Sequence, residues 1–194
     1  GSSATASGLI AGNYSVTLTD ANNCQTLLSI SISEPAPLQL SATMSNVSCY
    51  GGNTGSISLS LSGGTPSYSY AWNNGAPSGP SIGGLTAGNF LCTVTDQHGC
   101  TISSSTTISE PPALQASLVA LHDVSCAGGN DGDAGVTVQG GTPPYSYSWS
   151  PGNGTTASVN GLFAGNYSVR VTDAMGCEDL LGVTISQPSA LIVT

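Results

Sequence analysis

An internal repeat of 76 to 77 residues is the feature that most constrains this chain. Three segments return at that spacing: AGNYSVTLTDANNC at 11–24 as AGNFLCTVTDQHGC at 87–100 and AGNYSVRVTDAMGC at 164–177, VSCYGGNTG at 47–55 as VSCAGGNDG at 124–132, and GGTPSYSYAW at 63–72 as GGTPPYSYSW at 140–149. Self-similarity at a fixed period is typical of a chain that uses one structural unit several times in series. We therefore divide the chain by this period.

The period predicts two complete units between two partial ones. The complete units occupy residues 38–113 and 114–190. Residues 1–37 are predicted to be the C-terminal half of an earlier unit, and residues 191–194 the start of a further one. Because both ends fall inside a unit, we expect the chain to be a segment of a longer array.

Each unit has the residue pattern of a small β-sandwich. Ile57, Leu59 and Leu61 alternate with serine, which gives one apolar and one polar face to an extended strand. Gly, Pro, Asn and Asp interrupt such stretches every 8 to 12 residues, and no segment has a helical stripe. Six or seven short antiparallel strands per unit predict an all-β protein of tandem immunoglobulin-like sandwiches, arranged as an extended rod.

Aromatic residues recur at fixed places and are predicted to fill the cores. Trp72 and Trp149 stand on patterned strands, where an indole packs between two sheets. Tyr14, Phe90 and Tyr167 share one position at the start of the sixth strand. A tyrosine there commonly donates its hydroxyl hydrogen to upstream backbone, forming a tyrosine corner. Phe90 cannot make that bond, so we expect the middle unit to be weaker at this corner.

The charge composition excludes several classes of partner. The chain has ten acidic residues, one basic residue and a formal net charge of −9, while 39% of it is hydrophobic. Nucleic-acid binding requires several Lys and Arg side chains to neutralise phosphates, so it is excluded. An anionic membrane surface would repel this chain, and no apolar run is long enough for membrane insertion.

The order of four motifs also resembles a known family. VSCxGGxxG, GGTPxYSYxW, LxAGNYxVxVTDxxGC and ISxP, in that order, look like the SprB repeat, a relative of PKD-type immunoglobulin-fold domains. That repeat occurs in tandem in large surface proteins of gliding Bacteroidetes. The resemblance implies an extracellular adhesin or filament exported by the type IX secretion route, and it supplies no catalytic residue.

The cysteines carry the strongest chemical signal. Five of the six follow the repeat, which indicates disulfides in an oxidising compartment. One bond per unit predicts Cys49–Cys100 and Cys126–Cys177. A plain sandwich, however, places these loops at opposite ends, so a bond across the junction, such as Cys49–Cys177, stays open as the alternative. The sixth, Cys92, replaces valine on an inward strand face and is predicted to be a buried thiol. The sequence has no CxxC motif and no pair of histidines close together, so it does not favour a zinc site.

Other candidate sites are weaker. Asn130, Asp131 and Asp133 resemble a calcium loop, but the equivalent segment of the preceding unit has no acidic residue, so we favour a glycine-rich turn without a cofactor. The repeating aspartates Asp20, Asp96 and Asp173 are interpreted as turn residues. His98 and His122 are isolated in the sequence, which argues against an enzyme.

These features favour a structural stalk. Short, proline-containing linkers between repeats predict a stiff spacer in a secreted cell-surface protein, whose partners are the neighbouring repeats of the same chain. Two alternatives remain. One is a carbohydrate-binding module that stacks exposed aromatic rings on a surface polysaccharide, and the other is a fibre subunit that pairs with further copies in a filament.

Overall fold

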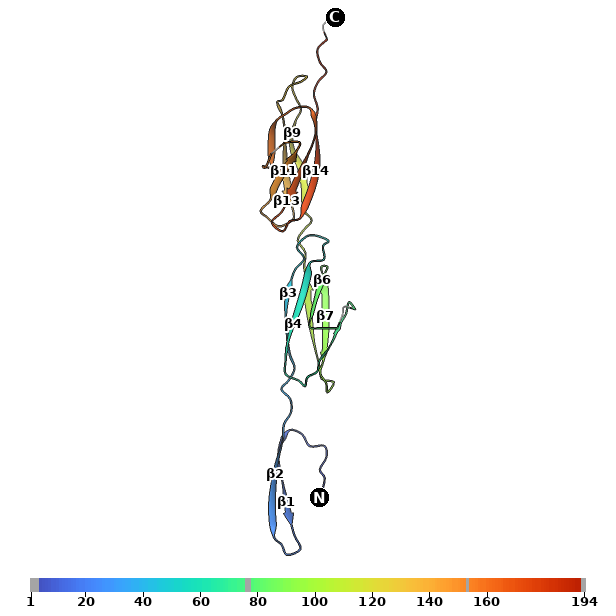
Figure 1. Cartoon of the computed structure of the whole chain (residues 1–194), viewed down its shortest axis with the longest axis vertical. Helices are drawn as coiled ribbons and strands as arrows, with labels where there is room; N and C mark the ends of the chain where they lie inside the picture. The colour runs from blue at the N-terminus through green and yellow to red at the C-terminus, as the bar shows by residue number, and fades with distance from the viewer. Residues whose placement is uncertain (1–3, 76–77, 153, 193–194) are drawn as a thin grey trace.

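The computed structural model describes residues 4–75, 78–152 and 154–192, and these residues form strands without any helix. The outermost residues of the two predicted partial units, 1–3 and 193–194, lie outside the described part. Figure 1 shows a two-stranded hairpin and two sandwiches following one another along the chain.

The first sandwich contains six strands in two three-stranded sheets. Its strands are β3 (Gln39–Ser45), β4 (Gly55–Ser62), β5 (Ser69–Trp72), β6 (Ser81–Leu85), β7 (Gly88–Thr95) and β8 (Thr101–Ile108). One sheet has the order β3-β4-β6 and the other β5-β7-β8, with antiparallel pairing throughout. This is the A-B-E and C-F-G arrangement of an immunoglobulin-like sandwich.

The second sandwich repeats this topology strand for strand. Its strands are β9 (Gln115–His122), β10 (Gly132–Gln139), β11 (Ser146–Ser150), β12 (Ser158–Leu162), β13 (Gly165–Thr172) and β14 (Glu178–Ile185). The sheets are β12-β10-β9 and β11-β13-β14. The prediction of an all-β chain with tandem immunoglobulin-like sandwiches is confirmed.

Each sandwich has a core of its own between its two sheets. Ile57, Trp72 and Phe90 are buried in the first core, and Trp149 and Val169 in the second. The indole N–H of each tryptophan donates to a backbone oxygen, that of Gly79 or Thr156, so neither ring buries an unpaired polar group. Tyr167 is half-buried against the second core.

The N-terminal hairpin lacks an opposite sheet within the described residues. β1 (Gly12–Thr19) pairs with β2 (Gln25–Ile32), and apolar residues such as Leu18 remain exposed on it. Tyr14 was predicted to be a core residue, and that prediction is wrong for this chain, because Tyr14 is only half-buried and packs into neither core. It does form the expected corner, since its hydroxyl donates to the Ile10 carbonyl oxygen at 2.8 Å.

Candidate functional site at the repeat junction

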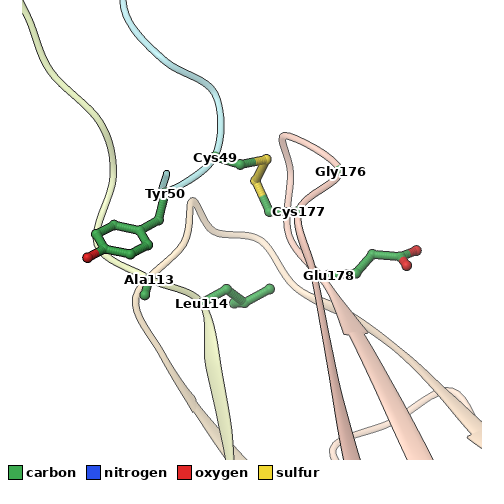
Figure 2. A pocket seen from close by; sticks show the side chains of 7 residues that line it. All are labelled: Cys49, Tyr50, Ala113, Leu114, Gly176, Cys177 and Glu178. Carbon is green, nitrogen blue, oxygen red and sulfur yellow. A yellow bond between two sulfur atoms is a disulfide. The ribbon is translucent and has the colours of Figure 1, made fainter. Parts of the chain in front are cut away.

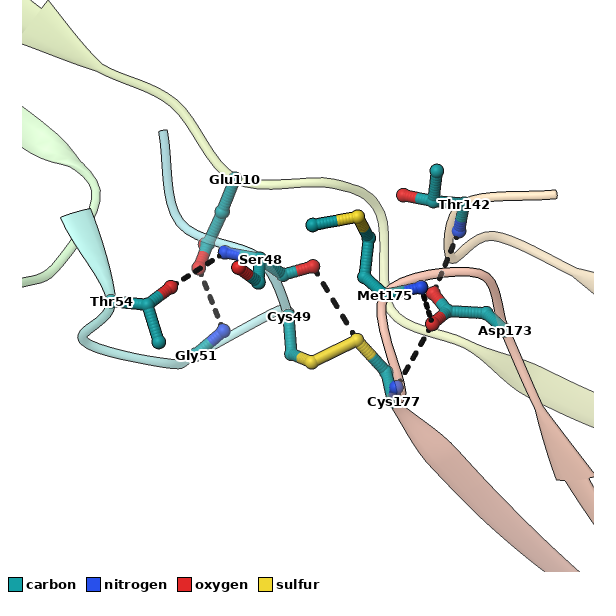
Figure 3. The surroundings of a disulfide bond; sticks show 9 residues. All are labelled: Ser48, Cys49, Gly51, Thr54, Glu110, Thr142, Asp173, Met175 and Cys177. Atoms are coloured by element: carbon teal, nitrogen blue, oxygen red, sulfur yellow. Dashed lines mark hydrogen bonds between the residues drawn. A yellow bond between two sulfur atoms is a disulfide. The ribbon is translucent and has the colours of Figure 1, made fainter. Parts of the chain in front are cut away.

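A disulfide joins the two sandwiches across their junction. Cys49, in the loop between β3 and β4, is bonded to Cys177, in the turn between β13 and β14 (Figure 3). Their Cα atoms lie 5.7 Å apart, although 128 positions separate them in the sequence. Two segments that face the junction from opposite sides therefore meet here. We call residues 46–54 and 123–131 the cysteine loops, and residues 20–24, 96–100 and 173–177 the cysteine turns.

The predicted bonds within units, Cys49–Cys100 and Cys126–Cys177, are wrong. Cys100 directly precedes β8, whereas the cysteine loop of Cys49 is tied to the far end of β8, where Val47 N–H donates to the Ser109 carbonyl oxygen. Eight extended residues span roughly 26 Å, far more than the roughly 7 Å that a disulfide allows between Cα atoms. The bond across the junction, which the sequence left open, is the one present.

An aspartate shapes each cysteine turn. Asp173 Oδ1 accepts hydrogen bonds from the backbone N–H groups of Met175 and Cys177, at 2.8 and 2.9 Å. Its Oδ2 accepts from Thr142 N–H at 2.8 Å, which ties the turn to the β10–β11 loop, where Gly140 and Gly141 form the glycine pair (Figure 3). Asp96 accepts from the equivalent groups of Thr65, His98 and Cys100. The carboxylate thus sets the position of the cysteine that follows it.

These hydrogen bonds favour the charged carboxylate. The N–H group of Thr65 is the main reason that the pKa of Asp96 lies below its ordinary value. Burial raises the pKa of Asp173, but the backbone N–H groups of Thr142, Cys177 and Met175 outweigh it, and the net shift is again downward. Both aspartates are only 6% exposed, so each is a buried charge satisfied by backbone donors.

The cysteine loop is attached to the linker that leaves its own sandwich, which for the first sandwich is residues 109–114, between β8 and β9. Gly51 N–H donates to Glu110 Oε2 at 2.7 Å, and Ser48 N–H donates to Thr54 Oγ1 at 2.8 Å (Figure 3). Cys177 Sγ lies 3.4 Å from the Ser48 carbonyl oxygen, a close contact beside the disulfide. The loop therefore holds Cys49 next to the linker, facing the following sandwich.

The linker itself is held by the following sandwich. Gly141 N–H donates to the Pro112 carbonyl oxygen at 2.8 Å, and Gly64 N–H makes the same bond to Ala36 at 2.7 Å. Gly140 adopts φ +69°, and a Cβ there would overlap the carbonyl oxygen of Ala113. The two glycines of the repeated GGT motif thus allow the linker to lie directly on the β10–β11 loop.

A hollow of about 500 Å³ lies beside the disulfide (Figure 2). Its lining comes from both sandwiches and from the linker: Cys49, Tyr50, Ala113, Leu114, Gly176, Cys177 and Glu178. The Tyr50 side chain is largely exposed. The hollow is the space left between two covalently joined domains, and its walls carry one carboxylate.

The two aspartates among the predicted calcium residues are engaged with protein groups. Asp131 Oδ1 accepts from Ser125 N–H at 3.0 Å, and hydrogen bonds from Ser125 lower the pKa of Asp131. Asp133 Oδ1 lies 2.6 Å from His122 Nδ1. No cluster of three His, Cys, Asp or Glu side chains suited to a metal occurs among the described residues.

The histidines have partners that sequence reasoning missed. His122 was interpreted as isolated, but β9 and β10 pair so that it faces Asp133 directly. The preceding unit has serines at the equivalent places, Ser45 and Ser56, so the pair does not repeat. His98 Nδ1 lies 3.0 Å from Thr65 Oγ1 at the other cysteine turn.

The remaining cysteines are free thiols within the described chain. Cys92 is fully buried in the first core, and burial raises the pKa of its thiol. Cys24, Cys100 and Cys126 are exposed. The roles of Glu110 and of the glycine pair were also missed, although the ISEPPAL linker and the GGTP motif both recur in the sequence.

A family model for the SprB repeat matches the chain at residues 41–77 and 119–154. Each match starts in the first strand of a sandwich and includes its cysteine loop. Together the two matches span less than half of the chain, and they confirm the predicted resemblance. A comparison with curated proteins finds no match.

Solved structures with similar folds include several proteins with immunoglobulin domains. The N-terminal eight Ig domains of Down Syndrome Cell Adhesion Molecule are 14% identical with a TM-score of 0.47, and the match covers 92% of this chain and 28% of that one. Sidekick-1 immunoglobulin domains 1–5 are 15% identical (TM-score 0.37; 91% and 45%). The S-layer protein rSbsC(31-844) is 17% identical (TM-score 0.35; 88% and 31%). This chain thus spans less than half of each.

Proposed function

We propose that this chain, which carries two SprB repeats, is a spacer segment of a secreted cell-surface adhesin or filament. Its role is to extend the protein from the cell as a stiff series of sandwiches for adhesion or gliding. The observation that carries the proposal is the covalently closed junction between Cys49 and Cys177. A disulfide of this kind supports an oxidising, extracellular location, and the described residues contain no helix that could cross a membrane.

Three contacts at the same junction support stiffness. The linker is hydrogen-bonded to the preceding cysteine loop through Glu110 and to the following glycine pair through Pro112. The disulfide adds a second covalent connection beside the linker. Two connections between the same two bodies restrict bending far more than one, so relative domain motion, the default for small interfaces, is suppressed here.

The carbohydrate-binding alternative has less support. Stacking on a sugar requires exposed aromatic faces, but both tryptophans are buried, at 7% and 2% exposure. Tyr50 and Phe163 are exposed aromatic residues, one on a cysteine loop and one before β13. A glycan array probed with the full chain and with Tyr50→Ala discriminates the two functions, because glycan binding lost in the variant would favour the module.

Small-angle X-ray scattering tests the spacer proposal. Two and a half units of roughly 35 Å each, in line, give a radius of gyration of about 26 Å, against about 16 Å for a compact domain of this length. We expect the oxidised chain to give the larger value and a rod-like profile. The Cys49→Ser/Cys177→Ser variant serves as the comparison and should show a broader distribution of lengths. A compact oxidised chain would refute the proposal.

We further propose that the protein is exported by the type IX route and belongs to a Bacteroidetes gliding apparatus. Both proposals follow from the family resemblance and stay predictions. A surface polysaccharide or further copies in a filament also stay predictions as partners beyond the neighbouring repeats.

A further inference from the structure

The two cysteine loops are held in the same way, although only one of them forms a disulfide. Val47 N–H donates to Ser109, and Val124 N–H donates to Ser186, both at 2.9 Å. Gly128 N–H donates to Gln187 Oε1 at 2.8 Å, as Gly51 N–H does to Glu110. Cys126 is therefore presented at the end of the second sandwich as Cys49 is at the end of the first, but its thiol is exposed and free.

The cysteine turns are equivalent as well. Asp96 positions Cys100 through the same backbone hydrogen bonds by which Asp173 positions Cys177. A hollow of about 530 Å³ lies beside Cys100 and is walled by the preceding linker, including Pro37 and Leu38. The hollow beside Cys177 has the equivalent linker wall, but Cys49 and Tyr50 of a cysteine loop also line it. At Cys100 no cysteine loop contributes to the described lining.

We propose that one disulfide closes every junction of the array, from the cysteine loop of one repeat to the cysteine turn of the next. Cys126 then bonds to the turn cysteine of a following repeat, and Cys100 bonds to the loop cysteine of a preceding one. The inference rests on the proposed function, because it requires repeats in series. Each bond forms when two thiols lose two protons and two electrons to a disulfide oxidant, which is reduced to two thiols. Cys92 takes no part, because it is buried.

Disulfides placed in this way overlap along the sequence, because Cys126, where the second bond begins, lies between Cys49 and Cys177. This overlap limits how far the array can lengthen. The loop cysteine after Cys126 is expected 77 residues further on, about 26 residues beyond Cys177. The shortest covalent route through two repeats then crosses the disulfides and follows the backbone only for those 26 residues, which is about 90 Å when fully extended. Without the bonds the route through two repeats is about 540 Å. Two folded repeats already span roughly 70 Å, so a stapled array under tension barely extends even if its sandwiches unfold.

An added repeat supplies the missing partner within one chain. We would insert a second copy of residues 114–190 directly after Ala190, where the linker sequence continues in frame, with Ala127→Val and Met175→Leu in the copy so that its two cysteine peptides differ in mass from the original ones. After thiol blocking and digestion without reductant, mass spectrometry should find Cys126 bonded to Cys177 of the inserted repeat, alongside Cys49–Cys177. Recovery of Cys126 as a blocked thiol in the folded protein would overturn the inference, and so would a bond between Cys126 and the Cys177 of its own repeat.

A matched variant adds a mechanical readout. In the lengthened chain, Cys126→Ser removes one of the two overlapping bonds and leaves Cys49–Cys177 in place. Pulled by its ends in a single-molecule force experiment, the variant should stretch about 90 Å further than its parent, since the shortest covalent route gains about 26 residues. Equal lengths would contradict the overlapping register.

Scattering from the same lengthened chain separates the two proposals. A rod in which Cys126 stays free refutes the repeated disulfide and leaves the spacer function standing. A bent or compact chain in which both bonds have formed refutes the spacer function alone.

Discussion

A single carboxylate in each cysteine turn connects two loops that lie far apart in the sequence. Asp173 accepts hydrogen bonds from its own turn and from Thr142, 31 residues upstream. Asp96 does the same in the first sandwich. The aspartate therefore positions both the cysteine and the glycine-pair loop that holds the linker. At the scale of one residue, an aspartate that the sequence predicts to be a turn residue also holds the junction together.

The contribution of the Asp173 carboxylate to folding stability should depend on pH. The pKa of Asp173 is lower in the folded than in the unfolded protein, so its contribution to stability is present above the unfolded value, about 3.9, and is lost as pH falls through the folded value. We expect Asp173→Asn to lower the melting temperature at pH 7 by roughly 5–10 °C, and the gap to the parent to narrow at pH 3. Glu34→Gln, at an exposed carboxylate, is the control, and a gap independent of pH would contradict the assignment.

The tyrosine corner offers a second test at one residue. Tyr167 donates its hydroxyl hydrogen to the Phe163 carbonyl oxygen at 3.1 Å, whereas Phe90 lacks a hydroxyl. Phe90→Tyr should bring a donor to the Thr86 carbonyl oxygen, four residues upstream, and stabilise the first sandwich by about 1 kcal/mol. Tyr167→Phe should destabilise the second by a similar amount. Urea unfolding measures both changes, and two unchanged midpoints would show that the corner contributes nothing.

At the scale of elements, the linker and the loop that receives it form one unit of structure. The linker is too short to pack on itself, and its carbonyl groups bond instead to the glycine pairs. Any side chain at Gly63 or Gly140 would occupy the place of a linker carbonyl group. The geometry of the junction therefore depends on the absence of a Cβ atom at one position of the repeat, the first glycine of the GGT motif.

Gly140→Ala tests this dependence. The substitution combines a positive φ with overlap of the Ala113 carbonyl group, so we expect a loss of stability of at least about 2 kcal/mol. Gly161→Ala is the matched control, because Gly161 has φ +72° but nothing closer than 3.9 Å to its Cβ position, and it should cost only about 1 kcal/mol. Chemical denaturation compares the two variants, and equal losses would mean that the linker contact is unimportant.

At the scale of the whole molecule, the disulfide covalently links two sandwiches whose cores are separate. Each sandwich has its own buried cluster, and the described cores share no residue. The Cys49–Cys177 bond nevertheless encloses most of both sandwiches in one covalent loop. Unfolding of either sandwich leaves a closed loop in the chain, which lowers the entropy of the unfolded state.

Removal of the bond should therefore destabilise the molecule. We expect Cys49→Ser/Cys177→Ser to lose about 5 kcal/mol of unfolding free energy in the chain-entropy account, because the bond closes a long loop. Cys24→Ser/Cys126→Ser replaces two exposed free thiols and serves as the matched control, with a change below about 0.5 kcal/mol. Urea denaturation of both variants, with remaining thiols blocked after unfolding, measures the difference. Similar losses in the two variants would assign the effect to the substitutions themselves.

Local patterns in the sequence were sufficient to predict the strands, the two-sheet fold and the buried tryptophans. Alternation at Ile57, Leu59 and Leu61 reflects a face of β4 that must be buried, and this requirement acts within one element. Turn residues such as Asp173 are equally local, since the carboxylate bonds to groups two and four residues away. Because the repeat of 76 to 77 residues occurs in both sandwiches, each of these features could be predicted twice.

Only the tertiary structure decided which cysteines meet. Equal spacing suggested Cys49–Cys100 and Cys126–Cys177, but the length of β8 separates the two ends of a sandwich, and the linker brings the loop of one unit to the turn of the next. His122 and Asp133 likewise meet only because β9 and β10 pair in a particular register. Distances between residues on different elements depend on how those elements stack, and no spacing along the chain contains that information.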